Sequence, residues 1–236
     1  MTARAPLRGG IIAAGDGSRL REAGFPMPKP LVPVAGVPLI ESTIGNFVAA
    51  GVASLVIIVN EQARTCVEWV LGRFPDLDVE FIVKTTESSL ESFLEVSRRM
   101  RGGPALISTV DAWCWPADFV RFVDAALRRP SNASVLAVTP LVADEDPLWV
   151  HVDEEGRVQG LGERPATLVT AGVYLISDRA RAVPAPPSLG RLREFLAWLV
   201  RQGEPVYAEA IGSVVDVDRA SDVALAEALA RAGRET

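Results

Sequence analysis

The residues best suited to chemistry in this sequence lie in one glycine-containing turn near the N-terminus. The stretch IIAAGDGSRL, residues 11–20, is an apolar run that leads into Gly15, Gly17, Ser18 and Arg19. Glycines let backbone N–H groups approach phosphate oxygens closely, and an arginine beside them supplies positive charge. The turn lacks the third glycine of a dinucleotide fingerprint and the Gly-Lys-Ser/Thr of a P-loop. It therefore predicts a phosphate-binding turn of another kind.

A second cation follows shortly after this turn, in the segment MPKPLVPV. Lys29 stands between Pro28 and Pro30, and the fixed φ angles of the two prolines favour an extended backbone that sets the direction of the lysine. We expect Lys29 and Arg19 to be solvent exposed and to contact the same anionic ligand.

Carboxylates that follow two later apolar runs are candidate metal ligands. Asp111 comes just after the run ALIST at 105–109, and Asp216 and Asp218 lie in the late segment VVDVD. Proteins commonly hold Mg²⁺ with one or two carboxylates together with substrate phosphates. Side chains alternate along a strand, so Asp216 and Asp218 share a face. Asp218 is the favoured second ligand, although an aspartate just before a helix is also a common N-cap.

Length, composition and charge narrow the class of protein. The chain has 236 residues, 49% of them hydrophobic, which suffices for a sizeable core, and its net charge of -6 disfavours nucleic acid as a partner. Cys66 and Cys114 are too few for a disulfide framework or a zinc site, which predicts a reducing cytoplasm. No apolar run approaches the ~18 residues of a membrane helix, so we expect neither a membrane span nor a signal peptide.

Apolar runs alternate with helical stripes along the chain and predict the elements that must position these residues. Short β-rich runs occupy 11–14, 55–59, 79–83, 105–109 and 134–138, with amphipathic helical spacing between them. After residue 140 the pattern becomes richer in strands: a hairpin over 148–161, a strand over 167–177, and a last helix from Ala220 to Ala232. This pattern predicts one α/β domain over 1–236, with a mixed, mainly parallel sheet covered by helices on both faces.

The two N-terminal motifs together resemble the signature of a known family. IIAAGDGSRL followed by PKPLVPVAGVPLIE is similar to the pattern of sugar-1-phosphate nucleotidyltransferases, members of the nucleotide-diphospho-sugar transferase superfamily. The resemblance implies a Rossmann-like α/β/α sandwich of the glycosyltransferase-A type. It implies Arg19, Lys29 and Asp111 as catalytic residues, with Asp111 also a metal ligand. The implied nucleotide-binding residues are Ala13, Ala14, Gly15, Gly17, Ser18 and Thr86.

The segment VQGLGERPATLVTAGVYLIS, residues 158–177, resembles the acceptor-binding part of the same family. The resemblance implies that Glu163 binds sugar hydroxyls and that Arg164, in place of the family's lysine, binds the sugar phosphate. It also implies that Gly172 keeps the backbone close to the sugar. A surface ion pair is the alternative role for Glu163 and Arg164.

The reaction implied by the resemblance is transfer of NMP from an NTP to a sugar 1-phosphate, giving an NDP-sugar and pyrophosphate. The transfer needs little general-base help, because the second pKa of a phosphate monoester, ~6, leaves it largely dianionic at pH 7. Mg²⁺ is the expected cofactor, and the expected assembly is a monomer or homodimer. The nucleotide is expected to bind the half at about 1–140 and the acceptor the half at about 141–236.

The identity of the substrates stays open at this point. The segment KTTESSLESF, residues 84–93, falls where the family recognises the base, and it offers only hydroxyls for that purpose. One alternative is a cytidylyltransferase for phosphocholine or another phosphoalcohol, in which Trp113 and Trp115 beside Asp111 hold a quaternary ammonium by cation–π attraction. The other is a non-catalytic, nucleotide-sugar-binding regulatory subunit of the same fold.

Overall fold

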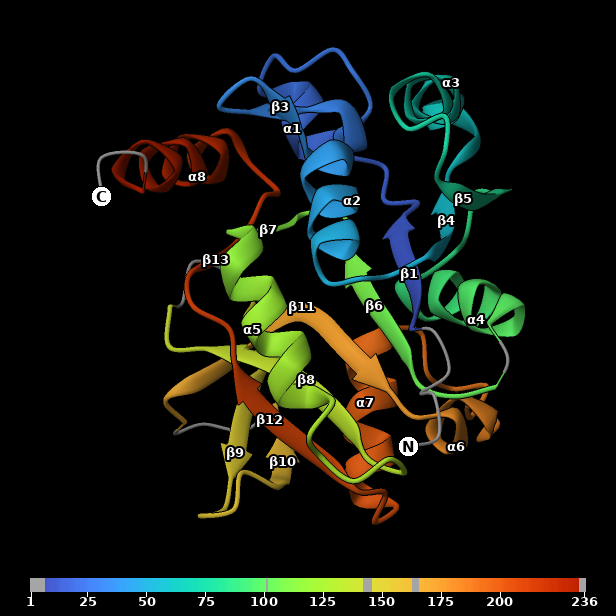
Figure 1. Ribbon diagram of the computed structural model, residues 1–236, viewed down its shortest axis with the longest axis vertical. Helices are drawn as coiled ribbons and strands as arrows, with labels where there is room; N and C mark the ends of the chain where they lie inside the picture. Colours follow the sequence, from blue (N-terminus) through green and yellow to red (C-terminus); the bar gives the residue numbers. More distant parts are fainter. Residues whose placement is uncertain (1–6, 101, 142–145, 163–165, 234–236) are drawn as a thin grey trace.

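A mixed nine-stranded sheet runs through the molecule (Figure 1). The computed structural model describes residues 7–100, 102–141, 146–162 and 166–233. The N-terminal part of the sheet is parallel, with β1 between β6 and β4, and β5 at the edge beside β4. These strands span Arg8–Ala13 for β1, Ser54–Val59 for β4, Asp78–Val83 for β5 and Ala105–Thr109 for β6. Because the carboxyl ends of parallel strands meet at one edge, the turns after β1, β4, β5 and β6 lie together.

The C-terminal part of the sheet is mainly antiparallel and is centred on one long strand, β11. Its C-terminal part, Val173–Ile176, pairs with β6, its first two residues pair with β9, and β8 pairs with it near both ends. Strand β12 runs parallel to β8. The bounds are Ser134–Thr139 for β8, Trp149–Val152 for β9, Val158–Leu161 for β10, Leu168–Ile176 for β11 and Val206–Ala210 for β12. The β6–β11 pairing therefore joins the two parts of the sheet directly.

Two small sheets and the helices complete the described structure. The small sheets pair Pro33–Val34 (β2) with Val37–Pro38 (β3), and Ala112–Cys114 (β7) with Val214–Asp216 (β13). The helices are Ser18–Glu22 (α1), Leu39–Ala49 (α2), Arg64–Arg73 (α3), Ser89–Arg99 (α4), Pro116–Ala126 (α5), Asp178–Ala182 (α6), Leu192–Arg201 (α7) and Ala220–Ala232 (α8), with 3₁₀ turns at Lys29–Leu31 (η1) and Glu61–Ala63 (η2). In the described part of the chain, no helix has the length and apolar character needed to cross a membrane.

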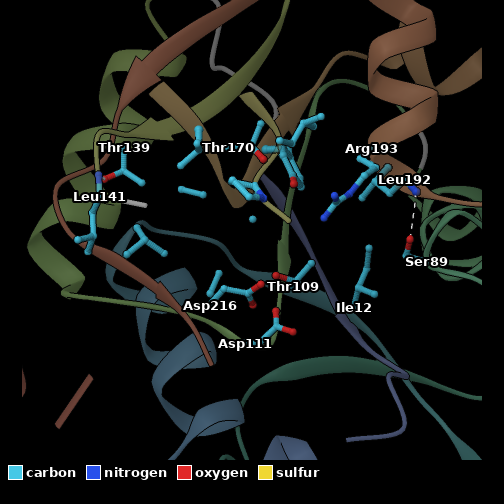
Figure 2. A pocket seen from close by; sticks show the side chains of 18 residues that line it. Ile12, Ser89, Thr109, Asp111, Thr139, Leu141, Thr170, Leu192, Arg193 and Asp216 are labelled. Carbon is cyan, nitrogen blue, oxygen red and sulfur yellow. Dashed lines mark hydrogen bonds between the residues drawn. The ribbon is translucent and has the colours of Figure 1, made fainter. Parts of the chain in front are cut away.

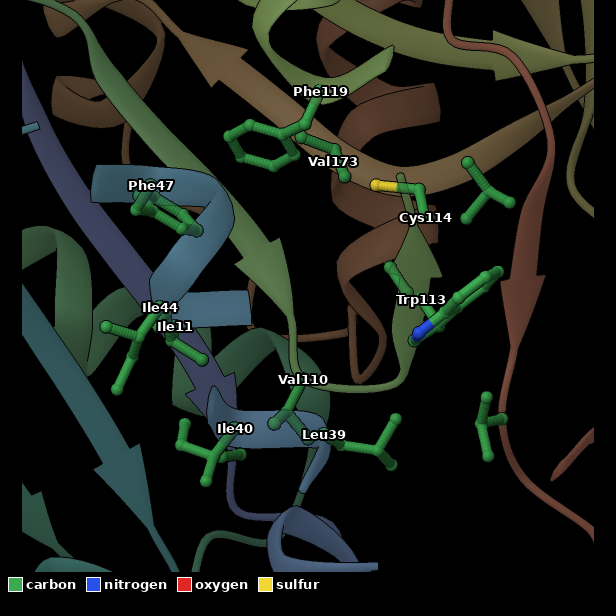
Figure 3. Packing of buried hydrophobic residues seen from close by; sticks show 14 of the residues in the cluster. Ile11, Leu39, Ile40, Ile44, Phe47, Val110, Trp113, Cys114, Phe119 and Val173 are labelled. Atoms are coloured by element: carbon green, nitrogen blue, oxygen red, sulfur yellow. The ribbon is translucent and has the colours of Figure 1, made fainter. Parts of the chain in front are cut away.

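Side chains of the sheet alternate between two apolar layers, one on each face. In β1, Ile11 contributes to the layer beneath α2, α3, α5 and α8, and Ile12 contributes to the layer beneath α4 and α7. Figure 3 shows the first layer, where Phe47 and Phe119 meet with ring centroids 5.2 Å apart. Buried aromatic rings contribute much of the stability of such cores. Replacing one by alanine typically lowers the free energy of unfolding by about 3–5 kcal/mol. The two layers hold the sheet, and hence its carboxyl edge, in a fixed position.

Most of the predicted elements are confirmed. The strands predicted at 55–59, 79–83 and 105–109 correspond to β4, β5 and β6, and the helix predicted from Ala220 to Ala232 is α8. The mixed sheet with helices on both faces is confirmed as well. The sequence did not predict β7, a short strand whose partner β13 lies about a hundred residues away.

Candidate active site

The glycine-containing turn connects the end of β1 to α1. Gly17 has a φ of 61°, and a Cβ placed on it would lie 2.8 Å from Cβ of Lys29, so this position requires glycine for its backbone and for its packing. A Cβ on Gly15 would meet no atom within 4 Å. The Asp16 carboxylate accepts a hydrogen bond from the backbone N–H of Ser18, at 3.1 Å. Within this turn, the space beside Gly15 is therefore open to a ligand, whereas the space beside Gly17 is filled by Lys29.

Lys29 lies at the centre of a cluster of charges from four separate segments. Its Nζ is 2.6 Å from Oδ2 of Asp111 and 2.5 Å from Oδ1 of Asp218. Nη1 of Arg19 donates to the other oxygen of Asp218, at 2.5 Å. The structure therefore brings together Arg19, Lys29, Asp111 and Asp218, as the sequence predicts.

Two expectations for Lys29 are wrong. Its side chain is only 7% exposed, whereas that of Arg19 is 59% exposed, so the two cations do not share a solvated setting. Lys29 also begins a 3₁₀ turn, η1, rather than an extended segment, and its backbone C=O accepts from the N–H of Val32. The carboxylates of Asp111 and Asp218 cover the ammonium end of this side chain, and Gly17 lies close to its Cβ.

The carboxylates set the protonation state of this cluster. Burial opposes the charge of Lys29, but Asp111 and Asp218 outweigh it and raise the pKa of the ammonium above its ordinary value. Burial likewise opposes ionisation of Asp218, yet Lys29 and Arg19 hold the pKa of that carboxyl below its usual range. Lys29 and Asp218 are consequently both charged near neutral pH.

Pairing of β13 with β7 explains how Asp218 reaches Asp111. The register places Asp216 opposite Ala112, and the N–H of Val217 donates to the backbone oxygen of Asp111, at 3.0 Å. Asp218 does not cap α8 with its side chain. Asp222 takes that role, because its Oδ2 accepts from the N–H groups of Asp218 and Arg219, at 3.0 and 2.7 Å. The helix-capping alternative for Asp218 is therefore wrong.

Two cavities meet at Asp111. The first, which we call the turn cavity, has a volume of about 440 Å³ and lies between the glycine-containing turn, the turn after β4 and the start of α4. The second, the sheet cavity, has about 190 Å³ and lies over β11 between β13 and α7 (Figure 2). Four residues line both: Ile12, Ser89, Thr109 and Asp111.

The sheet cavity combines a few polar groups with an apolar wall. The polar lining residues are Ser89, Thr109, Asp111, Thr139, Thr170, Tyr174, Arg193 and Asp216, as Figure 2 shows for those that it labels. Burial raises the pKa of Tyr174 to about 12, opposed by its hydrogen bond with Thr170, so the phenol is neutral and able to donate. Leu141, Pro147, Leu148, Val169, Leu192 and Val214 form the apolar wall.

Gly172 also lines the sheet cavity, at an irregularity of β11 between Thr170 and Tyr174. Its φ is 72°, and a Cβ there would lie 2.8 Å from Oγ1 of Thr109 and 2.9 Å from Cβ of Ala112. The glycine therefore lets β11 pass close to the residues on either side of Asp111.

The remaining predicted site residues divide into three groups. Ala13, Ala14, Gly15 and Thr86 line the turn cavity, whereas Gly17 and Ser18 adjoin it without lining it. Glu163 and Arg164 lie outside the described residues. Asp216 lines the sheet cavity, but it is Asp218 that contacts Lys29.

The tryptophans beside Asp111 have a packing role. Trp113 is 7% exposed and contacts Trp115 edge to face, with ring centroids 5.7 Å apart. Neither indole is among the described side chains that line the turn cavity or the sheet cavity. The proposed cation–π contact with a bound quaternary ammonium in these cavities is therefore wrong.

Asn60 and Gln62 line the turn cavity, although the sequence pattern did not single them out. Nδ2 of Asn60 donates to the backbone oxygen of Gly15, at 3.0 Å, and its Oδ1 accepts from the N–H of Ala63, at 2.8 Å. Asn60 thus ties the end of β4 to the glycine-containing turn. A polar residue directly after the strand predicted at 55–59 was the available signal, since neighbouring parallel strands end at the same edge.

The carboxylates of this site suit a divalent cation. Among the described residues no group of three or more His, Cys, Asp or Glu side chains is arranged to hold a metal alone. Mg²⁺ seldom needs such a group, because water and substrate phosphates complete its shell. Asp111 and Asp218 already converge on a single cation, the Lys29 ammonium, so the donor set fits.

Comparison with known proteins identifies a matching family and relatives of this chain by sequence. Residues 9–154 match the family described as "MobA-like NTP transferase domain". A CMP-5'-(3-aminopropyl)phosphonate synthase of Streptomyces rubellomurinus is 30% identical over 197 residues, covering 79% of this chain and 31% of that protein. A glucose-1-phosphate thymidylyltransferase of Actinoplanes sp. is 30% identical over 198 residues, covering 79% and 64%. The chain thus spans less than two thirds of these relatives.

Solved structures show the same fold. The inositol-1-phosphate CTP transferase from T. maritima superposes with a TM-score of 0.82 at 20% identity, covering 97% of this chain and 96% of the other. A UDP-glucose pyrophosphorylase in complex with UDP-glucose gives 0.79 at 14% identity, covering 97% and 99%. The Rossmann-like α/β fold of the glycosyltransferase-A type is therefore confirmed.

Proposed function

This chain belongs to the MobA-like NTP transferase domain family, and on that basis we propose that it transfers NMP from an NTP to a sugar 1-phosphate. The products would be an NDP-sugar and pyrophosphate. The observation that carries the proposal is the position of Asp111, paired with Lys29, on the wall shared by the turn cavity and the sheet cavity. Two substrates bound in these cavities would meet at that wall.

The turn cavity is the proposed NTP site. Its volume of about 440 Å³ falls in the range of small-molecule sites, about 300–1,000 Å³. The open space at Gly15 allows phosphate oxygens to approach the backbone, and Lys29 supplies a fixed positive charge there. Arg19, more exposed, would reach the phosphates from the solvent side.

The reaction needs charge neutralisation more than proton transfer. An oxygen of the acceptor phosphate attacks the α-phosphorus, the bond from that phosphorus to the bridging oxygen breaks, and pyrophosphate leaves with the electron pair. The acceptor is already dianionic near pH 7, because its second pKa is ~6. Lys29 and Arg19 would offset the repulsion between the two anions as they approach.

Mg²⁺ is the proposed cofactor. Asp111 and Asp218 would hold it, with Asp216 as the alternative second ligand, since the first two already converge on one cation. When bound, the ion neutralises phosphate charge and polarises the phosphoryl oxygens. The chain's own carboxylates would fix its place at the wall between the cavities.

Cytidylyl transfer to a phosphoalcohol or phosphonate is the second candidate function. The 30% identity with the CMP-5'-(3-aminopropyl)phosphonate synthase of S. rubellomurinus favours it. The complete set of Arg19, Lys29, Asp111 and Asp218 supports catalysis over a non-catalytic regulatory role. A cytoplasmic location and a monomeric or homodimeric state remain predictions.

Pyrophosphate release tests this proposal. The purified chain is incubated with Mg²⁺, each of the four NTPs, and glucose 1-phosphate, mannose 1-phosphate, inositol 1-phosphate, phosphocholine or 3-aminopropylphosphonate. Release that depends on a sugar 1-phosphate is the expected result. Release only with CTP and a non-sugar acceptor would establish the second candidate instead. No release from any pair, with nucleotide-sugar binding retained, would support the regulatory role.

A further inference from the structure

Arg193 gives the sheet cavity its positive charge. No other lysine or arginine is found among the described residues that line this cavity, whereas Asp111 and Asp216 both line it. Arg193 belongs to the first turn of α7, and Figure 2 shows its guanidinium reaching into the cavity on the side of Ile12 and Ser89. Both of these neighbours also line the turn cavity. Arg193 therefore lies near the wall where the two cavities meet.

An exposed partner holds Arg193 in place. Nη1 donates to the backbone oxygen and to Oδ2 of Asp146, both at 2.8 Å. The arginine side chain is 33% exposed and the Asp146 side chain 74% exposed, so water screens this ion pair strongly. Both hydrogen bonds use one nitrogen, and a guanidinium has five N–H donors. Within the described part of the chain, Arg193 consequently retains donors for a further, bidentate partner.

An acceptor phosphate would need this charge. A dianionic group entering the sheet cavity meets the carboxylates of Asp111 and Asp216, and the Lys29 ammonium lines the turn cavity instead. Arginine matches the geometry of a phosphoryl group with two parallel hydrogen bonds. We propose that Arg193 binds the phosphoryl group of the acceptor and directs it toward the wall shared with the turn cavity.

This assignment rests on the proposed nucleotidyl transfer and adds a residue to it. The sequence resemblance places the phosphate-binding cation at Arg164, which lies outside the described residues. Along the chain, β11 and α6 lie between Arg164 and Arg193. Its role follows from the cavity that it lines rather than from a motif.

Three variants test the role of Arg193. Arg193→Gln removes the charge, Arg193→Lys keeps the charge without the planar fork, and Arg191→Gln is the matched control. Arg191 is 64% exposed, lies 3.6 Å from the same Asp146 carboxylate, and does not line the sheet cavity. With the best acceptor from the pyrophosphate assay, Arg193→Gln should raise the acceptor KM by about tenfold or more, as expected for loss of a charged bidentate contact. The NTP KM should stay within about twofold, as should both values in Arg191→Gln.

The acceptor KM of Arg193→Lys should lie between that of wild type and that of Arg193→Gln. A merely structural role for Arg193 would not produce this order. A folded Arg193→Gln with a wild-type acceptor KM would overturn the proposal. So would equal increases in the KM values of NTP and acceptor.

Calorimetric titration with glucose 1-phosphate separates this proposal from the proposed function. If wild type binds the ligand, and Arg193→Gln binds it at least about tenfold more weakly than Arg191→Gln, the assignment of Arg193 stands even where no pyrophosphate is released. Equal affinity in the two variants would reject the phosphate-binding role of Arg193 and would leave the proposal of nucleotidyl transfer standing. Absence of binding to wild type, together with absence of turnover, would reject both.

Discussion

Lys29 is a buried cation whose charge depends on two carboxylates from distant parts of the chain. Its side chain is 7% exposed, and the carboxylates of Asp111 and Asp218 lie 2.6 and 2.5 Å from its Nζ. Removing one partner from such a cluster leaves uncompensated charge in a poorly solvated place. Stability and charge neutralisation therefore depend on the same lysine.

Replacing Lys29 should lower both stability and turnover. Breaking a buried ion pair costs about 3–5 kcal/mol, and discounting for the partial exposure of Asp218 gives about 2–3 kcal/mol for Lys29→Met at pH 7. Arg19→Gln, in contrast, should cost below about 1 kcal/mol, because the arginine is largely exposed. Both variants should reduce kcat/KM for the NTP. Urea denaturation and steady-state kinetics provide the two measurements.

The stability difference for Lys29→Met should depend on pH. The lowered pKa of Asp218 means that its contribution is present above its ordinary pKa and is lost as the pH falls through the lower, folded-state value. The raised pKa of Lys29 keeps that group charged throughout the range. The gap between wild type and Lys29→Met should thus be largest near pH 7 and shrink toward pH 3. A gap that widens on acidification would contradict the assignment.

The two late aspartates should differ in their importance. Asp218 contacts Lys29 and Arg19, whereas Asp216 lines the sheet cavity, so Asp218→Asn should lower kcat/KM by about tenfold or more relative to Asp216→Asn. A titration of activity with Mg²⁺ should also show weaker apparent metal affinity in Asp218→Asn. Greater damage from Asp216→Asn would make Asp216 the second ligand.

For single residues, the sequence predicted which side chains form the site better than it predicted how buried they are. Arg19, Lys29, Asp111 and Asp218 follow from motif and strand-end position, and the structure brings them together. The burial of Lys29 did not follow, because it depends on carboxylates 82 and 189 residues further along the chain. Such long-range contacts leave no local signal.

Among the elements, β11 links the halves of the sheet and forms the floor of the sheet cavity. Its irregularity at Gly172 brings the strand against Thr109 and Ala112, which flank the segment that carries Asp111. The strand itself was predictable from its apolar run. The irregularity was not, because it reflects contacts with β6 and β7 rather than local preference.

Gly172→Ala should disturb both the strand and the site. A left-handed backbone costs an L-residue about 1–2 kcal/mol, and displacing Thr109 and Ala112 adds to that cost. Gly45→Ala is the matched control, because a Cβ at this position in α2 meets no atom within 4 Å and should stabilise the helix by about 0.5–1 kcal/mol. Thermal unfolding should shift in opposite directions in the two variants. Equal melting temperatures for Gly172→Ala and Gly45→Ala would contradict the strain expected at position 172.

On the scale of the whole molecule, the two parts of the sheet each present one cavity to a shared wall. The turn cavity lies at the carboxyl edge of the parallel strands, and the sheet cavity lies over β11. The α/β class and the sheet with covered faces were predictable from alternating apolar runs. The meeting of the cavities was not, because it depends on how β6 pairs with β11 and how β13 pairs with β7.

Turnover of Asp111→Asn tests the central claim most directly. Asparagine preserves the shape of Asp111 and removes the charge at the shared wall, while Lys29 keeps Asp218 as a partner. Asp124→Asn, an exposed position in α5 outside both cavities, is the control. We predict that kcat for pyrophosphate release falls by about a hundredfold or more in Asp111→Asn, with cooperative unfolding retained, and stays at the wild-type value in Asp124→Asn. Wild-type turnover in a folded Asp111→Asn would contradict the assignment of this wall as the site of transfer.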